Sequence, residues 1–198
     1  MEHQKISAIF QENRLFENLD AVTNIHITTG KTKEEITGFL KKMELDDIAG
    51  KPVSEYSGGM KRRVAIAGVM AMRPEVLILD EPTAGLDPRG REEILEEIKA
   101  YRRQTGATIL LVSHSMEDVA RHAQQILVMN AGKVFCYGTV ENVFRRSQEL
   151  QAIGLAVPQI TRVCNALRAK GIPLTEDIFT VEQAKEQLIA WYRKKGEQ

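Results

Sequence analysis

Two adjacent acidic residues, Asp80 and Glu81, follow directly after the apolar run from Val76 to Leu79. Such a run is typical of a strand buried on both faces, and α/β sheets bind their ligands where strands end. A carboxylate in this place can bind Mg²⁺, directly or through water. We therefore expect Asp80 to hold the metal and Glu81 to point to a different side of the chain. Taken in isolation, Asp-Glu-Pro is equally compatible with a polar strand end.

A second group is the tripeptide Ser57-Gly58-Gly59, which precedes a predicted helix that ends near Met72. Two consecutive glycines allow the backbone to approach an anion closely. A helix N-terminus adds free N–H groups and the positive end of the helix dipole. The tripeptide therefore indicates an anion site, although by itself it also fits a simple glycine turn in which Ser57 caps the helix.

The elements that must position these groups alternate between strands and helices. Strands are predicted at 6–10, 76–79, 107–112, 125–130 and 133–137. Helices are predicted at 32–43, 57–72, 87–103, after Ser115, 160–170 and 181–195, with an irregular stretch from 147 to 158. The start signals are Thr32 with Glu35, Asp87 before a proline, and Thr180 with Gln183. This alternation implies a mostly parallel sheet in a three-layer α/β sandwich, followed by a small helical appendage from about residue 148.

Four motifs occur in a fixed order: Y-S-G-G-M-K-R-R at 56–63, V-L-I-L-D-E-P-T at 76–83, A-G-L-D at 84–87 and V-S-H at 112–114. With these motifs the sequence resembles the nucleotide-binding domain of ABC transporters over roughly residues 6–146. From Lys61 onward it is similar to the ATPase subunits of energy-coupling-factor vitamin importers, whereas residues 6–20 resemble importers of the nitrate or taurine type. The resemblance implies a P-loop NTPase-like domain at 1–147, with a helical subdomain at about 12–72, and an appendage at 148–198.

The resemblance also implies a role for each residue that matches a family motif. Asp80 would hold Mg²⁺ and Glu81 would act as general base on the attacking water. His114 would reach the γ-phosphate of ATP and Glu81, and Gln11 would sense Mg²⁺ and a membrane subunit. The implied activity is ATP hydrolysis coupled to transmembrane transport.

The other matching residues imply a dimer. Ser57, Gly58 and Gly59 would grip the γ-phosphate of ATP held by the opposite subunit, and Asp87 would cross the dimer interface. The implied cofactors are ATP and Mg²⁺. The implied partners are a second ATPase subunit and an integral membrane subunit, at the cytoplasmic face of the cell membrane.

The sequence departs from the family in one respect, because it contains no G-x-x-x-x-G-K-[ST] segment to cradle phosphates. Thr29-Gly30-Lys31-Thr32 imitates the end of that motif, but Ile25 stands where its first glycine is required. Thr32 is also better explained as a helix cap. We therefore expect a domain that lacks its nucleotide-gripping front.

Composition limits the alternatives. Lys and Arg total 27 against 27 Asp and Glu, which argues against a nucleic-acid binder that works by a basic face. The apolar run from Val64 to Met72 falls short of the roughly 18 residues of a membrane span. Two alternatives stay open. One is a non-catalytic protein that contributes only its signature segment, Ser57-Gly58-Gly59, to the ATP bound by a partner; the other is a non-transport ABC ATPase. The second would carry long coiled coils or two tandem domains, for which we find no pattern.

Overall fold

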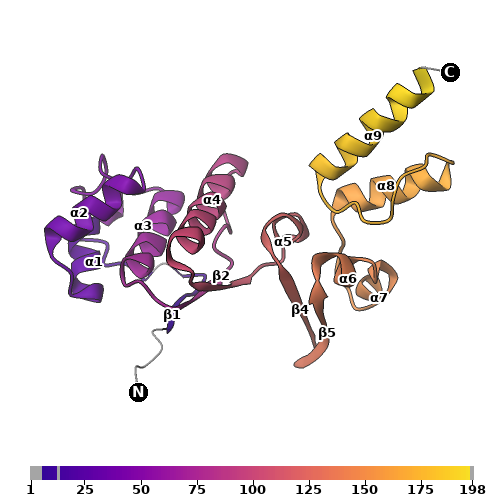
Figure 1. Cartoon of the computed structure of the whole chain (residues 1–198). Coiled ribbons are helices and arrows are strands. Elements are labelled where there is room, and N and C mark those ends of the chain that lie inside the picture. Colours follow the sequence, from indigo (N-terminus) through magenta and orange to yellow (C-terminus); the bar gives the residue numbers. More distant parts are fainter. Residues whose placement is uncertain (1–5, 13, 197–198) are drawn as a thin grey trace. The chain divides into compact units, whose positions relative to one another are not determined.

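The computed structural model describes residues 6–12 and 14–196, and the chain divides into two compact units, residues 1–112 and 113–198 (Figure 1). We describe each unit by itself. The sequence analysis expects an ATPase domain at 1–147 and an appendage at 148–198. That boundary separates family domains rather than compact units, so it stays a prediction.

The first unit is built on a three-stranded parallel sheet in the order β1-β2-β3. The strands are β1 (Ile6–Ile9), β2 (Val76–Asp80) and β3 (Thr108–Val112). In the register of the sheet Ile9 pairs with Leu79, and Leu79 pairs with Leu111. The predicted α/β class with a parallel sheet is confirmed.

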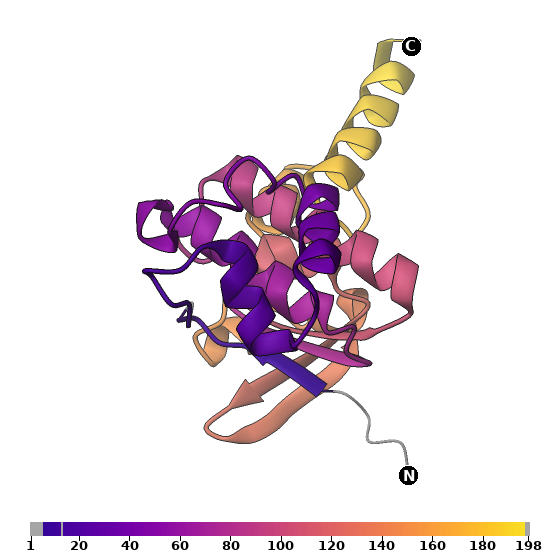
Figure 2. The ribbon, with the colours of Figure 1, turned by 90° about the vertical axis from the view of Figure 1, so that its left-hand side faces the viewer.

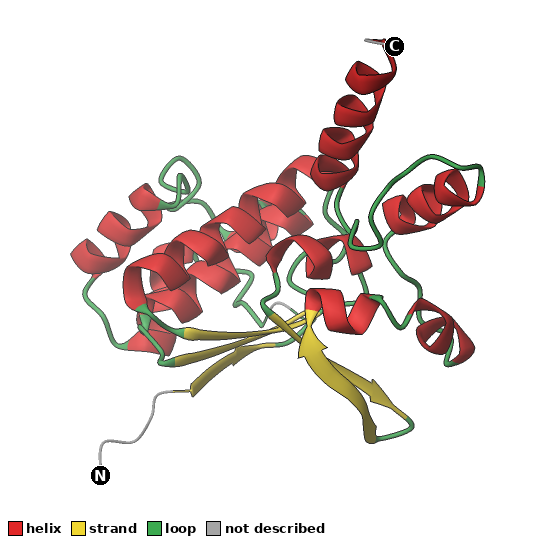
Figure 3. Ribbon diagram, turned by 45° about the vertical axis from the view of Figure 1, so that its right-hand side comes forward, coloured by secondary structure: helices red, strands yellow, loops and turns green. Residues whose placement is uncertain are grey.

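The helices of this unit lie on one side of its sheet (Figures 2 and 3). They are α1 (Ala21–Thr29), α2 (Lys33–Lys42), α3 (Gly58–Ala71) and α4 (Pro88–Thr105), with a short 3₁₀ helix at Val53–Glu55. Ile9, Leu77 and Leu79 are buried in the core that these helices share. On the opposite face, where strand residues alternate with the buried ones, Leu110 and Val112 are exposed.

Helix α1 was not expected from the sequence. Its nine residues are rich in β-branched side chains, which lowers helix propensity. The cap at Asp20, whose carboxylate accepts from the N–H of Thr23 at 2.7 Å, and the complete burial of Ala21 and Ile25 override that propensity. The helix ends at Gly30, where the left-handed φ of +68° favours glycine.

The second unit contains α5 (Met116–His122), β4 (Gln125–Asn130), β5 (Lys133–Thr139), α6 (Val140–Phe144), α7 (Ser147–Ala152), α8 (Gln159–Ala169) and α9 (Val181–Gly196). Strands β4 and β5, both predicted from the sequence, form an antiparallel hairpin. Helix α7 corrects the sequence analysis, which expected irregular chain there; burial of Leu150 in a core with Phe144 and Phe179 stabilises this short helix. Among the described residues, no helix combines the length and apolar character that crossing a membrane requires.

Candidate functional site

Asp80 and Glu81 lie at the carboxyl end of β2, where the chain turns away from the sheet. Asp80 is the last residue of the strand and is partly exposed. The N–H of Glu81 donates to the carbonyl of Val112 at 2.9 Å, so the turn is fixed against the end of β3. Glu81 has a φ of +47°, a left-handed conformation that is uncommon outside glycine. Such conformations cost roughly 1–3 kcal/mol and concentrate at functional sites.

Arg62 holds the surroundings of this turn together. Its side chain is buried among backbone carbonyls: Nη2 donates to Asp80 at 2.7 Å, Nε to Pro82 at 3.1 Å and Nη1 to Phe10 at 2.7 Å. Burial lowers the pKa of the Arg62 guanidinium, while the carboxylates of Asp80 and Glu81 act in the opposite direction. Sequence reasoning missed this role, since a pattern of residue types carries no signal for carbonyl acceptors.

The signature tripeptide begins helix α3. The Ser57 hydroxyl oxygen accepts from the N–H of Met60 at 3.2 Å, so Ser57 is the N-cap. A Cβ on Gly59 would lie 3.1 Å from Cδ2 of Leu86, so Gly59 permits close packing against the A-G-L-D segment. A Cβ on Gly58 would meet nothing within 4 Å. Internal packing therefore does not require glycine at 58, and its absent side chain leaves the start of the helix accessible.

Two further candidates lie on loops of the first unit. Asp87 is exposed and caps α4, because its Oδ1 accepts from the N–H of Gly90 at 2.9 Å. Gln11 is exposed directly after β1, and its carbonyl accepts from Arg62 Nη1 at 3.4 Å. Arg62 thus ties the Gln11 segment to the turn that carries Asp80.

Seven of the eight predicted site residues belong to the first unit. They are Gln11, Ser57, Gly58, Gly59, Asp80, Glu81 and Asp87. The eighth, His114, is exposed and follows β3 by two residues, at the beginning of the second unit.

The segment Thr29-Gly30-Lys31-Thr32, which imitates a phosphate loop, connects the end of α1 to the start of α2. Thr32 caps α2 in a capping box, in which its Oγ1 accepts from the N–H of Glu35 at 3.2 Å and its own N–H donates to Glu35 Oε2 at 2.9 Å. Lys31 Nζ lies 3.9 Å from the same carboxylate. The prediction that Thr32 acts as a helix cap is confirmed.

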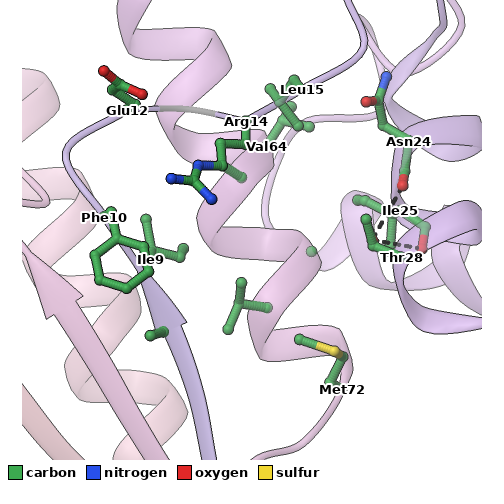
Figure 4. Close-up of a pocket in the computed structure, with 14 residues that line it drawn as sticks. Ile9, Phe10, Glu12, Arg14, Leu15, Asn24, Ile25, Thr28, Val64 and Met72 are labelled. Carbon is green, nitrogen blue, oxygen red and sulfur yellow. Dashed lines mark hydrogen bonds between the residues drawn. The ribbon is translucent and has the colours of Figure 1, made fainter.

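A cavity of about 230 Å³ opens beside the Gln11 segment, between β1, α1 and α3 (Figure 4). Its walls are mostly apolar, with Ile9, Ile25 and Val64 among them. Arg14 also lines it, and its guanidinium carbon lies 5.9 Å from the centre of the Phe10 ring. Glu12 lines it as well, so the cavity combines an apolar interior with one cation and one carboxylate.

The donor set fits a magnesium ion that relies on its substrate for further ligands. Within the part of the chain that the structure describes, no three His, Cys, Asp or Glu side chains gather as a metal cage. Mg²⁺ is commonly held by one or two carboxylates together with water and phosphate oxygens. Asp80 alone at a strand end suits that second arrangement.

Comparison with known proteins places these observations in a family. The family model described as ABC transporter matches residues 1–84. An "Energy-coupling factor transporter ATP-binding protein EcfA2" of Acetivibrio thermocellus is 42% identical over 201 residues, covering 96% of this chain and 71% of that protein. The chain belongs to the family of energy-coupling factor transporter ATP-binding proteins. The resemblance inferred from the sequence motifs is thereby confirmed.

Other members of the family extend beyond the matched region. The proteins of the same name from Caldanaerobacter subterraneus subsp. tengcongensis and Clostridium perfringens are 44% and 50% identical, over 93% and 81% of this chain. The chain spans 65% and 58% of their lengths, less than two thirds of each. A solved structure, cbiO1 from Clostridium perfringens, described as part of the ABC transporter complex cbiONQ, matches 83% of this chain and 68% of its own with a TM-score of 0.66 at 29% identity.

Proposed function

We propose that this chain is an ATP-binding and ATP-hydrolysing subunit of an importer of the energy-coupling factor type, which couples hydrolysis to transport. The observation that carries the proposal is the arrangement around Arg62. One buried guanidinium joins the signature helix, the strand end with Asp80 and the Gln11 segment. The names of the relatives support the transport role over that of a non-transport ABC ATPase.

Each site residue then has a defined task. Asp80 would hold Mg²⁺, which when bound neutralises charge on the phosphates. Glu81 would accept a proton from the attacking water, and its fixed left-handed turn orients the carboxylate. Gln11 and His114 would contact the same nucleotide site.

The partners would be a second ATPase subunit and an integral membrane subunit, with the chain bound peripherally at the cytoplasmic face of the membrane. Ser57, Gly58 and Gly59 would bind the γ-phosphate of ATP held by the second subunit, because the helix start is accessible at Gly58. Asp87 would lie at the interface between the two ATPase subunits. The cavity next to Gln11 would receive an apolar side chain of the membrane subunit.

A second candidate is a chain that only lends its signature to a partner's ATP. It requires only an accessible signature segment, and a Cβ on Gly58 would meet nothing within 4 Å. The domain organisation, 1–147 for the ATPase domain and 148–198 for the appendage, is the same under both proposals.

The test pairs the full chain with an ATPase subunit that has an intact phosphate loop but a disabled signature. ATP-dependent association is measured by light scattering for the wild type, Ser57→Arg and Glu81→Gln. Ser57→Arg should abolish association, because a bulky side chain fills the phosphate position and a hydroxyl donor is lost. Thr32→Arg, which removes a capping hydroxyl from another helix, should leave association unchanged.

The Glu81→Gln variant separates the two candidates. If the chain hydrolyses ATP at its own site, this substitution stops hydrolysis and traps the ATP-bound dimer. If the chain only lends its signature, the substitution has little effect. Unchanged association of Ser57→Arg would disprove the trans role of the signature under either candidate.

A further inference from the structure

The second unit contains a polar cavity of about 260 Å³ bordered by α6, α7, α8 and the loop before α9. Three arginines line it, Arg145, Arg146 and Arg168, together with two carboxylates. A cavity of this volume holds on the order of eight water molecules, since each occupies about 30 Å³. It is therefore large enough for a small organic or inorganic ion. We call it the Arg168 cavity.

Two of the three guanidiniums are already neutralised by carboxylates in paired hydrogen bonds. Arg145 donates to Asp177 from Nε at 2.6 Å and from Nη2 at 2.5 Å. Arg146 donates to Glu149 from Nε at 3.0 Å and from Nη2 at 2.5 Å. These pairs hold Arg145 and Arg146 in place beside the cavity. The positive charge that can attract a bound anion is therefore that of Arg168.

Arg168 lacks an equivalent partner for one of its buried nitrogens. Its Nη1 is buried and makes no hydrogen bond within the described residues. The nearest carboxylate oxygen, Glu176 Oε1, lies 3.9 Å away, which counts as an ion pair but is too long for a hydrogen bond. A buried charged donor without an acceptor is costly, so an acceptor in the cavity would be stabilising.

The residues around Arg168 can admit such an acceptor. The Glu176 side chain is 79% exposed, so it can turn into solvent and leave its place to another anion. Asn165 lies three residues before Arg168 on α8, hence on the same face of the helix, and also lines the cavity. Its amide offers a second donor beside the guanidinium. Thr161 is held in place by donating to the carbonyl of Ile178 at 2.8 Å.

We propose that the Arg168 cavity binds a small oxyanion, a phosphate or a carboxylate, which takes the place of Glu176 as the partner of Arg168. Guanidinium groups recognise both kinds of anion through parallel N–H donors. The site lies outside the residues assigned to ATP. It would give the second unit a ligand of its own.

The test uses the full chain and calorimetric titration with inorganic phosphate and, separately, with malonate, at constant ionic strength maintained with sodium chloride. At least one of the two anions should bind saturably, and the tighter one identifies the chemical group. Arg168→Gln should weaken that binding about tenfold or more, because it removes a charge-assisted hydrogen bond. Arg162→Gln, the same charge change at an exposed position of α8, should leave the affinity unchanged.

Glu176→Gln makes the test independent of any folding defect in the Arg168 variant. Removal of the competing carboxylate should tighten binding several-fold, a gain that loss of structure would not produce. Arg168→Lys keeps the charge but loses the planar fork, and should give an intermediate affinity. Absence of saturable binding for both anions, or equal affinities in wild type, Arg168→Gln and Glu176→Gln, would overturn the proposal.

Discussion

At the scale of single residues, the candidate site depends on Arg62 as much as on the acids that the sequence singles out. Asp80 and Glu81 are conspicuous because two carboxylates follow an apolar strand. Arg62 reads as one more basic residue in K-R-R, yet it is 97% buried by its surroundings, with 3% of its surface exposed. Its acceptors are carbonyls of residues far away in the sequence, so only the folded chain reveals its role.

Replacement of Arg62 by Met should destabilise the first unit strongly. The change leaves the carbonyls of Phe10, Asp80 and Pro82 without their buried donor, and hydrogen bonds to a charged group contribute about 1.5–3 kcal/mol each. We expect a loss of about 3 kcal/mol or more in the free energy of unfolding, measured by urea titration with far-UV circular dichroism. The neighbouring Lys61→Met, which removes only an ion pair to the exposed Glu17, should cause a much smaller loss. Similar losses for both variants would contradict the role given to Arg62.

At the scale of elements, the start signals read from the sequence prove to be helix caps. Thr32 with Glu35, Ser57, Asp87 and Thr180 with Gln183 all cap helices in the structure. A cap is neither required for a successful prediction, as α8 shows, nor sufficient for one, as α1 shows. Helices α1 and α7 were missed for different reasons. The first is rich in β-branched residues and is stabilised by burial, and the second has six residues and no side-chain cap. Tertiary packing decides both, and packing is not visible in a local pattern.

The capping box of α2 leads to a prediction for a pair of adjacent residues. Thr32→Ala should lower the free energy of unfolding by about 1 kcal/mol, as loss of an N-cap hydroxyl usually does. Lys31→Ala should leave the binding of Mg·ATP to the chain alone unchanged, since Lys31 belongs to a helix end rather than to a phosphate loop. Urea titration of Thr32→Ala and the wild type measures the loss of stability. Calorimetric titration of Lys31→Ala and the wild type with Mg·ATP measures the binding. A low-micromolar affinity in the wild type that Lys31→Ala removes would identify Lys31 as a phosphate ligand.

At the scale of the whole molecule, both units contain carboxyl groups with lowered pKa values, among them Glu17 and Glu35 in the first unit, while the pKa of Glu97 shifts the other way. In the first unit, burial raises the pKa of Glu97, and the hydrogen bond from Arg63 only partly offsets this effect. In the second unit, the hydrogen bonds from Arg145 and Arg146 lower the pKa values of Asp177 and Glu149. A lowered carboxyl pKa contributes stability that is present above the unfolded pKa of about 4 and is lost as the pH falls through the folded value. A raised carboxyl pKa, as at Glu97, lowers the stability of the folded state at pH values above the unfolded pKa.

Acid should therefore weaken the second unit through its Arg–carboxylate pairs. The only tryptophan of the chain, Trp191, lies in α9, so its fluorescence reports on this unit alone. At pH 7 Asp177→Asn should lower the urea midpoint seen by Trp191, because Arg145 loses its ionised partner. The gap between variant and wild type should begin to narrow below about pH 4 and close as the pH falls through the lowered pKa of Asp177, since protonation removes the charge that pairs with Arg145. Glu186→Gln, at an exposed position of the same helix, serves as the control. A gap that persists unchanged at pH 3 would mean that Asp177 stabilises the unit by its shape rather than by its charge.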